Sequence, residues 1–146
     1  MDDIKVDIRP LIPEGDYDAV LKKYETNRLF NTPKLYLHFE IITPGRGFGE
    51  TLYRAYRVKD LLGKQGKNGK FLIGNRSELY LTMCKLFEKR KNFRADRVRL
   101  KWFSNIVVKV SVRTVTKDYK QRDLPDCCQY SVIDNIKSIE VGTPIS

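Results

Sequence analysis

The sequence contains few of the residues that usually build catalytic and metal centres. Its 146 residues include one histidine, His38, and three cysteines, Cys84, Cys127 and Cys128. A nucleophilic triad or a zinc site needs several such groups at defined spacings, and the adjacent pair Cys127–Cys128 lacks the C-x-x-C spacing of a zinc ligand pair. An odd cysteine count does not make a disulfide framework, which indicates a reducing compartment.

Long hydrophobic runs are also missing from the chain. No apolar stretch approaches the roughly 20 residues that a membrane helix needs. The first ten residues, MDDIKVDIRP, are acidic and polar, unlike a signal peptide. We therefore expect no membrane association and a location in the cytoplasm.

Negative charge is the third shortage. The chain has 28 Lys and Arg against 18 Asp and Glu, which leaves a net charge of +10. Such an excess costs self-repulsion, and its common reason is a polyanionic partner, nucleic acid before an anionic membrane surface. A metal-dependent nuclease would need clustered carboxylates, whereas Asp16, Asp18, Glu40 and Glu50 are scattered. We therefore expect no enzymatic activity and no cofactor.

Alternating hydrophobic residues predict most of the secondary structure. Strands are expected over 15–26, 34–41, 50–58 and 105–116, with one or two more strands over 128–142. Val20 interrupts the alternation of the first strand, which indicates either a doubly buried end or a β-bulge. Residues 59–74 are basic and rich in glycine, and they predict either a flexible flap that closes over a ligand or an ordinary solvated loop.

One segment has a helical period instead. In residues 75–92, Leu79, Met83 and Leu86 recur at helical spacing, and Asn75 or Ser77 can cap the first turn. A single helix between the third and fourth of five strands is the order of the OB-fold, a small Greek-key barrel. We therefore predict one mainly β domain over residues 1–146, a five-stranded OB-fold barrel with a short N-terminal arm over 1–14.

The candidate site combines cations with aromatic rings. In the segment KLYLHFEI, residues 34–41, one face is apolar and the other carries a cation, a phenol and the histidine. The OB-fold binds oligomers on its second and third strands and on the loops after the first and fourth. The residues expected in the main groove are Lys22, Tyr24, Arg28, Phe30, Lys34, Tyr36, His38, Tyr53 and Arg57. Those expected to close one end are Lys109, Arg113, Lys117, Tyr119, Lys120 and Arg122.

This mixture suits a single-stranded nucleic acid, because cations follow the phosphates while unstacked bases lie on ring faces. Taken singly, each tyrosine is as well explained by an ordinary solvated sheet face, since tyrosine is a good strand residue. Trp102 is either a stacking residue or part of the core. The set as a whole, together with the net charge, favours a binding surface.

Several of these segments resemble a known family. IPEGDYDAVLKKYE, FGETLYRAYRV, the helix and FSNIVVKVSVRT are similar to the single-stranded DNA-binding proteins of bacteriophages and related mobile elements, over residues 11–141. The resemblance implies an OB-fold that coats and protects single-stranded DNA during replication or recombination in the cytoplasm of a bacterial host. It also implies replication or recombination proteins as further partners.

Two other functions are consistent with the sequence, and the C-terminal residues differ from those of the similar family. An RNA-binding OB-fold protein would show the same features, and so would a non-catalytic adaptor protein of a mobile element whose basic face meets an acidic protein. Bacterial single-strand binders recruit their partners through an acidic tail. The last residues here, SIEVGTPIS, contain only Glu140 as an acid, so we do not expect recruitment through a tail. The oligomeric state is left open.

Overall fold

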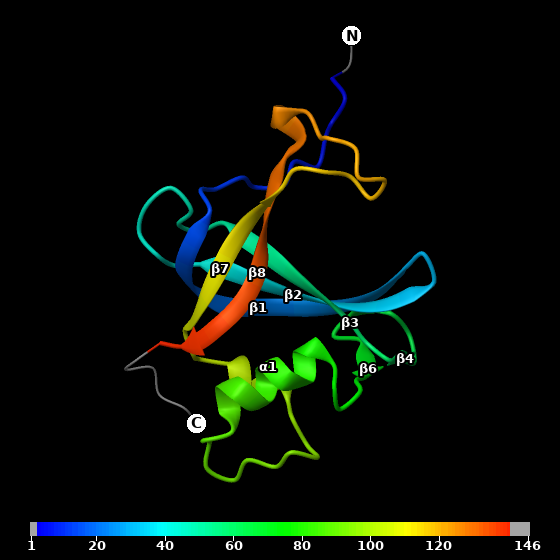
Figure 1. The fold of residues 1–146 in the computed structure, drawn as a ribbon, viewed down its shortest axis with the longest axis vertical. Coiled ribbons are helices and arrows are strands. Elements are labelled where there is room, and N and C mark those ends of the chain that lie inside the picture. The colour runs from blue at the N-terminus through cyan, green and yellow to red at the C-terminus, as the bar shows by residue number, and fades with distance from the viewer. Residues whose placement is uncertain (1–2, 141–146) are drawn as a thin grey trace.

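The structure is a computed structural model that describes residues 3–140, and over this range it is mainly β with one α-helix (Figure 1). Residues 1–2 of the expected arm and 141–142 of the expected last strand lie outside the described range. The long strands are β1 Gly15–Leu29, β2 Thr32–Ile41, β3 Thr51–Arg57, β7 Val108–Val115 and β8 Tyr130–Ile139. The remaining elements are β4 Asp60–Leu62, β5 Gly66–Lys67, β6 Lys70–Leu72, α1 Glu78–Phe87, and the 3₁₀ helices η1 Leu100–Phe103 and η2 Asp126–Cys128.

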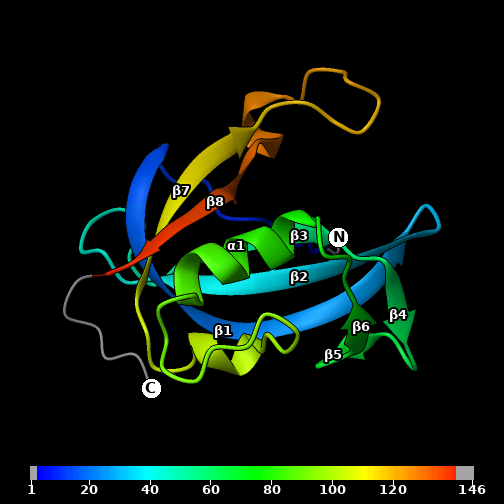
Figure 2. The same cartoon turned by 60° about the horizontal axis from the view of Figure 1, so that its bottom comes forward.

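The long strands form one antiparallel sheet in the order β3-β2-β1-β7-β8. Its edge strands β3 and β8 contact each other, but no ladder joins them within residues 3–140, so the sheet is open. Helix α1 contacts both edge strands and lies beside the opening between them (Figure 2). The prediction of a mainly β fold with one helix is confirmed, but the sheet is not closed within residues 3–140, and eight strands are present there instead of the predicted five.

The additional strands come from the segment predicted as a flap or loop. Residues 59–74 form a small β4–β6 sheet, and β5 pairs with β1 through Glu25–Lys67 and Thr26–Gly66. The Gly66 N–H donates to the Thr26 hydroxyl at 3.2 Å, and Thr26 itself is buried. Leu61 supplies an apolar anchor, because it is buried against the main core. The segment is therefore part of the folded sheet rather than a free flap.

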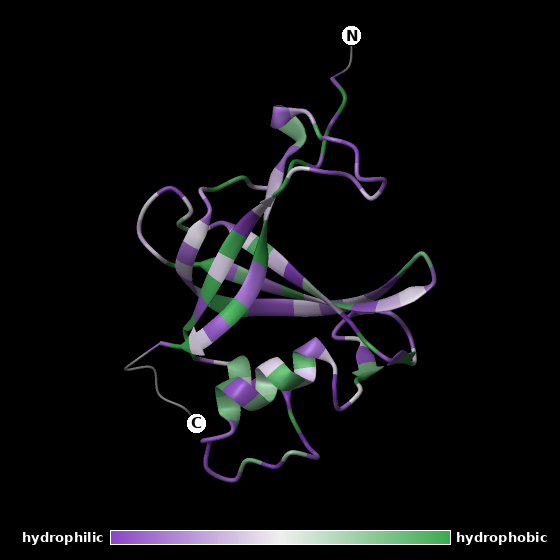
Figure 3. Ribbon diagram, viewed as in Figure 1, coloured by the Kyte–Doolittle hydropathy of each residue, from purple (hydrophilic) through white to green (hydrophobic). Residues whose placement is uncertain are grey.

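The core follows from the alternation of β2. Leu35, Leu37, Phe39 and Ile41 are fully buried, while the residues between them are partly exposed. Figure 3 shows this alternation as hydrophobic and hydrophilic bands along the strands. Phe103 of η1 packs edge-on against Phe39, with ring centroids 5.9 Å apart. The core therefore lies between one face of the sheet and the α1–η1 layer. The other face of β2 takes no part in core packing.

A β-bulge in β1 decides which of its side chains reach that face. The β1–β2 register shifts between Leu21 and Lys23, so Lys22 is an extra residue, and of the two predicted alternatives the structure has the bulge. Each residue after the bulge changes face relative to a regular strand. Tyr24 consequently pairs with Leu37 and packs against the core, and its predicted outward position is wrong.

Helix α1 confirms the helical period. The Ser77 hydroxyl accepts a hydrogen bond from the Tyr80 N–H at 3.2 Å, so Ser77 is the cap rather than Asn75. Leu79, Met83 and Phe87 are its buried residues, with Leu86 half-buried beside them. Within residues 3–140, no helix is long and apolar enough to cross a membrane.

Candidate nucleic-acid interface

The outer face of β1, β2 and β3 borders a groove with a volume of about 990 Å³. Its walls come from the N-terminal arm, the β1–β2 hairpin, β3, the β5 segment, the loop after β7 and the start of β8. Six of its lining residues have an aromatic or imidazole ring: Phe30, Tyr36, His38, Tyr53, Tyr119 and Tyr130. We call this set the ring surface.

Three of these rings form a stacked row. The Tyr36 and Tyr53 ring centroids are 5.4 Å apart with an angle of 11° between the ring planes. His38 also stacks with Tyr53, with the ring centroids 6.1 Å apart at 21°. The row follows from the β2–β3 register, which places His38 opposite Tyr53, and from the two-residue period that puts Tyr36 on the same face as His38.

The polar edges of the row are held in place by neighbouring groups. His38 Nε2 lies 2.8 Å from a Glu25 carboxylate oxygen, which fixes the imidazole plane. Burial raises the pKa of Tyr36 and the pKa of Tyr53 above the usual tyrosine value. Both side chains are therefore neutral phenols at neutral pH, and they can lie close to phosphates without charge repulsion.

Phe30 and Tyr119 form a second ring pair at the outer end of the groove. Phe30 and Asn31 connect β1 to β2 with positive φ angles of 51° and 63°, as in a type I′ turn. The loop predicted over NRLFNTP is thus a two-residue hairpin turn. The Phe30 and Tyr119 rings are both largely exposed, with centroids 5.6 Å apart. The loops after β1 and β7 therefore meet on one side of the molecule (Figure 1).

The loop after β7 is ordered by its own hydrogen bonds. The Asp118 carboxylate accepts from the backbone N–H groups of Lys120 and Arg122 and from the Arg122 side chain, at 2.9–3.0 Å. The hydrogen bond from the Arg122 backbone N–H is the main reason that the pKa of Asp118 lies below its usual value. Lys117 pairs with Asp123 at 2.6 Å. This arrangement presents Tyr119 outward, with the Lys120 ammonium 5.5 Å from its ring centroid.

Arg9 and Tyr130 are two of the groove's lining residues that were not predicted from the sequence. The Arg9 side chain donates a hydrogen bond to the Tyr53 hydroxyl at 3.2 Å, and its guanidinium lies 4.5 Å from the Tyr130 ring centroid. The arm is tied to β8, since the Ser131 N–H donates to the Pro10 carbonyl at 2.9 Å. Tyr130 could have been found as an aromatic residue opening the last strand, but no pattern indicates that the arm folds across the sheet.

Most of the predicted cations already form ion pairs with carboxylates of the same chain. Lys22 lies 3.9 Å from Glu40, Arg28 3.3 Å from Asp60, Arg113 3.0 Å from Asp134, and Lys109 lies 2.7 Å from Asp18 and 3.2 Å from Glu140. Hydrogen bonds to Asp18 and then to Glu140 raise the pKa of Lys109. These ion pairs neutralise charge that the sequence pattern assigned to a ligand.

The structure therefore brings together only part of the expected set. Phe30, Tyr36, His38, Tyr53, Lys117 and Tyr119 line one groove. Lys120 and Arg122 lie in the same loop as Tyr119, and Arg28 precedes the hairpin turn. Lys22, Tyr24, Lys109 and Arg113 are engaged with the core or with carboxylates instead.

Lys34 and Arg57 differ from the other strand cations. They are direct partners across β2 and β3, and neither forms an ion pair within residues 3–140. Like charges directly opposite each other in a sheet are destabilising. A phosphate bound between them would remove that repulsion, two residues along β2 from Tyr36.

No protein-family model, curated protein or solved structure matches this chain. Within the described part of the chain, no three His, Cys, Asp or Glu side chains are grouped so that they could hold a metal ion. The geometry of the groove is therefore the basis for a functional assignment.

Proposed function

We propose that the protein binds single-stranded DNA with little dependence on sequence, by stacking nucleobases on the ring surface. The observation that carries this proposal is the row Tyr36–Tyr53–His38, three near-parallel rings on the wall of an open groove. Every base has a π face, so stacking on such rings tolerates any sequence. A duplex hides its base faces in its own stack and cannot use these rings in the same way.

The strand order supports an OB-type assignment for the fold. The path β3-β2-β1-β7-β8, with α1 between the third and fourth long strands, has the connectivity of a five-stranded Greek-key barrel left open between β3 and β8. In that fold the oligomer lies over strands two and three and between the loops after strands one and four. Here those parts are β2, β3, the Phe30 turn and the Tyr119 loop, which together line the groove.

The biological role that fits this chemistry is the coating and protection of single-stranded DNA during replication or recombination. We place this role in the cytoplasm of a bacterial host, in line with the resemblance to the binding proteins of bacteriophages and mobile elements. It needs no catalytic step and no cofactor, and stacking together with a few phosphate contacts is sufficient.

The first test removes single rings from the row. Tyr36→Ala and Tyr53→Ala should each lower the affinity for an oligo-dT strand by about 5- to 150-fold, because a base–ring stack contributes roughly 1–3 kcal/mol. Fluorescence anisotropy of a labelled strand measures the change. Tyr36→Leu, which keeps apolar bulk without a ring, should behave like Tyr36→Ala and so separates stacking from packing.

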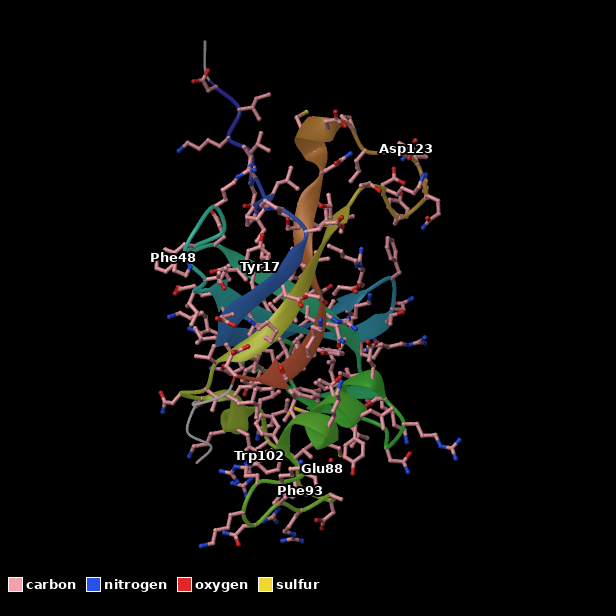
Figure 4. The ribbon with its side chains drawn as sticks, turned by 60° about the vertical axis from the view of Figure 1, so that its left-hand side comes forward. Tyr17, Phe48, Glu88, Phe93, Trp102 and Asp123 are labelled. Carbon is pink, nitrogen blue, oxygen red and sulfur yellow. The ribbon has the colours of Figure 1, made fainter. Side chains whose placement is uncertain are left out.

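Phe48→Ala is the matched control for this test. Phe48 is a largely exposed aromatic residue in the turn between β2 and β3 (Figure 4), and it is not one of the residues that line the groove. Its replacement should leave the affinity unchanged. If the tyrosine variants bind oligo-dT as tightly as Phe48→Ala does, the ring surface does not carry binding.

A further inference from the structure

The excess positive charge of the chain is concentrated away from the groove. Residues 85–101 contain eight of the 28 basic residues and two of the 18 acidic ones, so they hold six of the ten net positive charges. Figure 3 shows that the loop after α1, within this segment, is mostly hydrophilic. In Figure 4, Glu88, Phe93 and Trp102 lie at the opposite end of the molecule from Asp123, whose ion-pair partner Lys117 lines the groove.

A second cavity, with a volume of about 370 Å³, opens at this end. Its charged and aromatic lining residues are Arg90, Arg94, Arg97, Arg99, Lys101 and Trp102. The Trp102 ring packs against Phe87 and Phe93, with centroid distances of 5.5 and 5.9 Å, and the Arg90 guanidinium lies 5.0 Å from the Trp102 centroid. The ring is thus already engaged, and the cavity presents charge rather than a stacking surface.

Within the described part of the chain, three cations of this cavity lack the acidic partners that most of the cations predicted for the groove have. Arg94 pairs with Asp96 at 2.7 Å. Arg97, Arg99 and Lys101 are exposed and form no ion pair within residues 3–140. Clustering three such charges at one opening costs repulsion that a bound polyanion removes. Guanidinium groups also match the oxygen geometry of a phosphate through paired N–H donors.

We propose that Arg97, Arg99 and Lys101, here called the basic pole, bind the phosphodiester backbone of nucleic acid without contacting its bases. This inference rests on the proposed function for the identity of the ligand, and it adds a division of labour. The groove supplies stacking with most of its nearby charge neutralised, and the basic pole supplies the phosphate contacts. Salt should therefore act mainly on the basic pole, because counterion release accompanies phosphate contacts and not stacking.

A base-free strand isolates the basic pole from the groove. The probe is an oligomer of about twelve abasic deoxyribose phosphate units, labelled for anisotropy, which offers phosphates but nothing to stack. The triple variant Arg97→Gln, Arg99→Gln, Lys101→Gln should bind it at least tenfold more weakly at low salt. The slope of log affinity against log salt should also become shallower by about 0.7 for each phosphate that the variant no longer neutralises.

The matched control is the triple variant Arg46→Gln, Lys59→Gln, Lys70→Gln. It removes the same charge from exposed residues that form no ion pair within the described range and line neither cavity. Trp102 gives a second readout, because it is the only tryptophan in the chain. Its emission should change when the abasic oligomer is added to the unmodified protein, and the variant of the basic pole should show no such change.

Three outcomes separate the two proposals. If the two triple variants bind the abasic oligomer equally well, the basic pole is not a phosphate site, whatever the groove does. If a glutamate oligomer of the same length displaces the abasic strand as well as unlabelled abasic strand does, the basic pole is a site for an acidic peptide and the inference is overturned. If oligo-dT binds no more tightly than the abasic strand while the variant of the basic pole is impaired, the groove proposal fails and the basic pole stands.

Discussion

At the scale of single residues, Phe30 has a backbone conformation that aromatic side chains rarely adopt. Its φ of 51° belongs to a type I′ turn, a position where asparagine, aspartate or glycine costs less. The residue is 73% exposed, so core packing does not explain the choice of phenylalanine. Backbone strain that persists without a packing reason is often found at functional positions. The residue is therefore best explained by what its ring does beside Tyr119.

Replacing this residue tests that explanation. Phe30→Asn relieves the backbone strain in the turn but removes the ring that packs on Tyr119. These two effects on the free energy of unfolding are about 1 kcal/mol each and have opposite signs. The free energy of unfolding measured with denaturant should thus change by less than about 1 kcal/mol. Oligo-dT affinity should fall roughly tenfold, because one stacking partner is gone. Unchanged affinity would remove Phe30 from the binding surface.

The comparison of Tyr24 with Tyr36 shows how far sequence reasoning reaches for single residues. The alternation places Tyr24 opposite Ala19 and Leu21, and Tyr36 opposite Leu35 and Leu37, so it predicts an outward position for both tyrosines. The β2 pattern is regular, so the exposure of Tyr36 followed from its position, whereas one extra residue in β1 turned Tyr24 inward. The sequence indicated a bulge near Val20, but it did not show which residue is the extra one.

At the scale of elements, the docking of β5 on β1 depends on a close approach at Gly69. A Cβ atom added to Gly69 would lie 2.0 Å from the Thr26 hydroxyl oxygen and 3.0 Å from the Gly66 carbonyl oxygen. Thr26 is buried and β-branched, so it has little room to rotate away. Glycine is therefore required here by space and not by a positive φ angle.

Gly69→Ala should consequently lower the free energy of unfolding by about 1–3 kcal/mol, the usual cost of overpacking. Gly74→Ala is the control, because a Cβ atom at Gly74 meets nothing within 4 Å. Chemical denaturation measures both variants. The double variant Thr26→Ala, Gly69→Ala lacks the clashing hydroxyl. Its loss in free energy of unfolding should therefore be smaller than the sum of the losses of the two single variants. Equal stability of the two glycine variants would contradict the close approach.

The elements that sequence predicted best are those whose pattern has a local cause. The helix was found from its period and its serine cap, and the strands from their alternation. Residues 59–74 were expected to form a flap or loop because glycines and lysines dominate them, while their pairing with β1 depends on residues some 40 positions away. Long-range pairing of this kind leaves no periodic signal within the segment itself.

At the scale of the whole molecule, composition gave the amount of charge but not its location. The net charge of +10 suggested a basic groove, yet ion pairs neutralise most of the cations expected there, and six of the ten charges lie in residues 85–101. The position of carboxylates such as Glu40, Asp18 and Asp134 beside these cations depends on how the strands pair. A sequence read segment by segment does not show it.

Binding is thus divided between rings that recognise unpaired bases and cations that recognise phosphates. Oligo-dT and a duplex of equal length both carry phosphates, but only oligo-dT offers open base faces. The preference for the single strand should therefore arise from stacking, and it should persist as ionic strength rises even though both affinities fall.

The decisive measurement is the affinity of the unmodified protein for oligo-dT and for the duplex at two salt concentrations. Two or more stacked bases predict at least tenfold tighter binding of the single strand, with a ratio that is retained at the higher salt concentration. A ratio near one, or a preference that disappears as salt is raised, would show that the rings of the groove do not recognise bases.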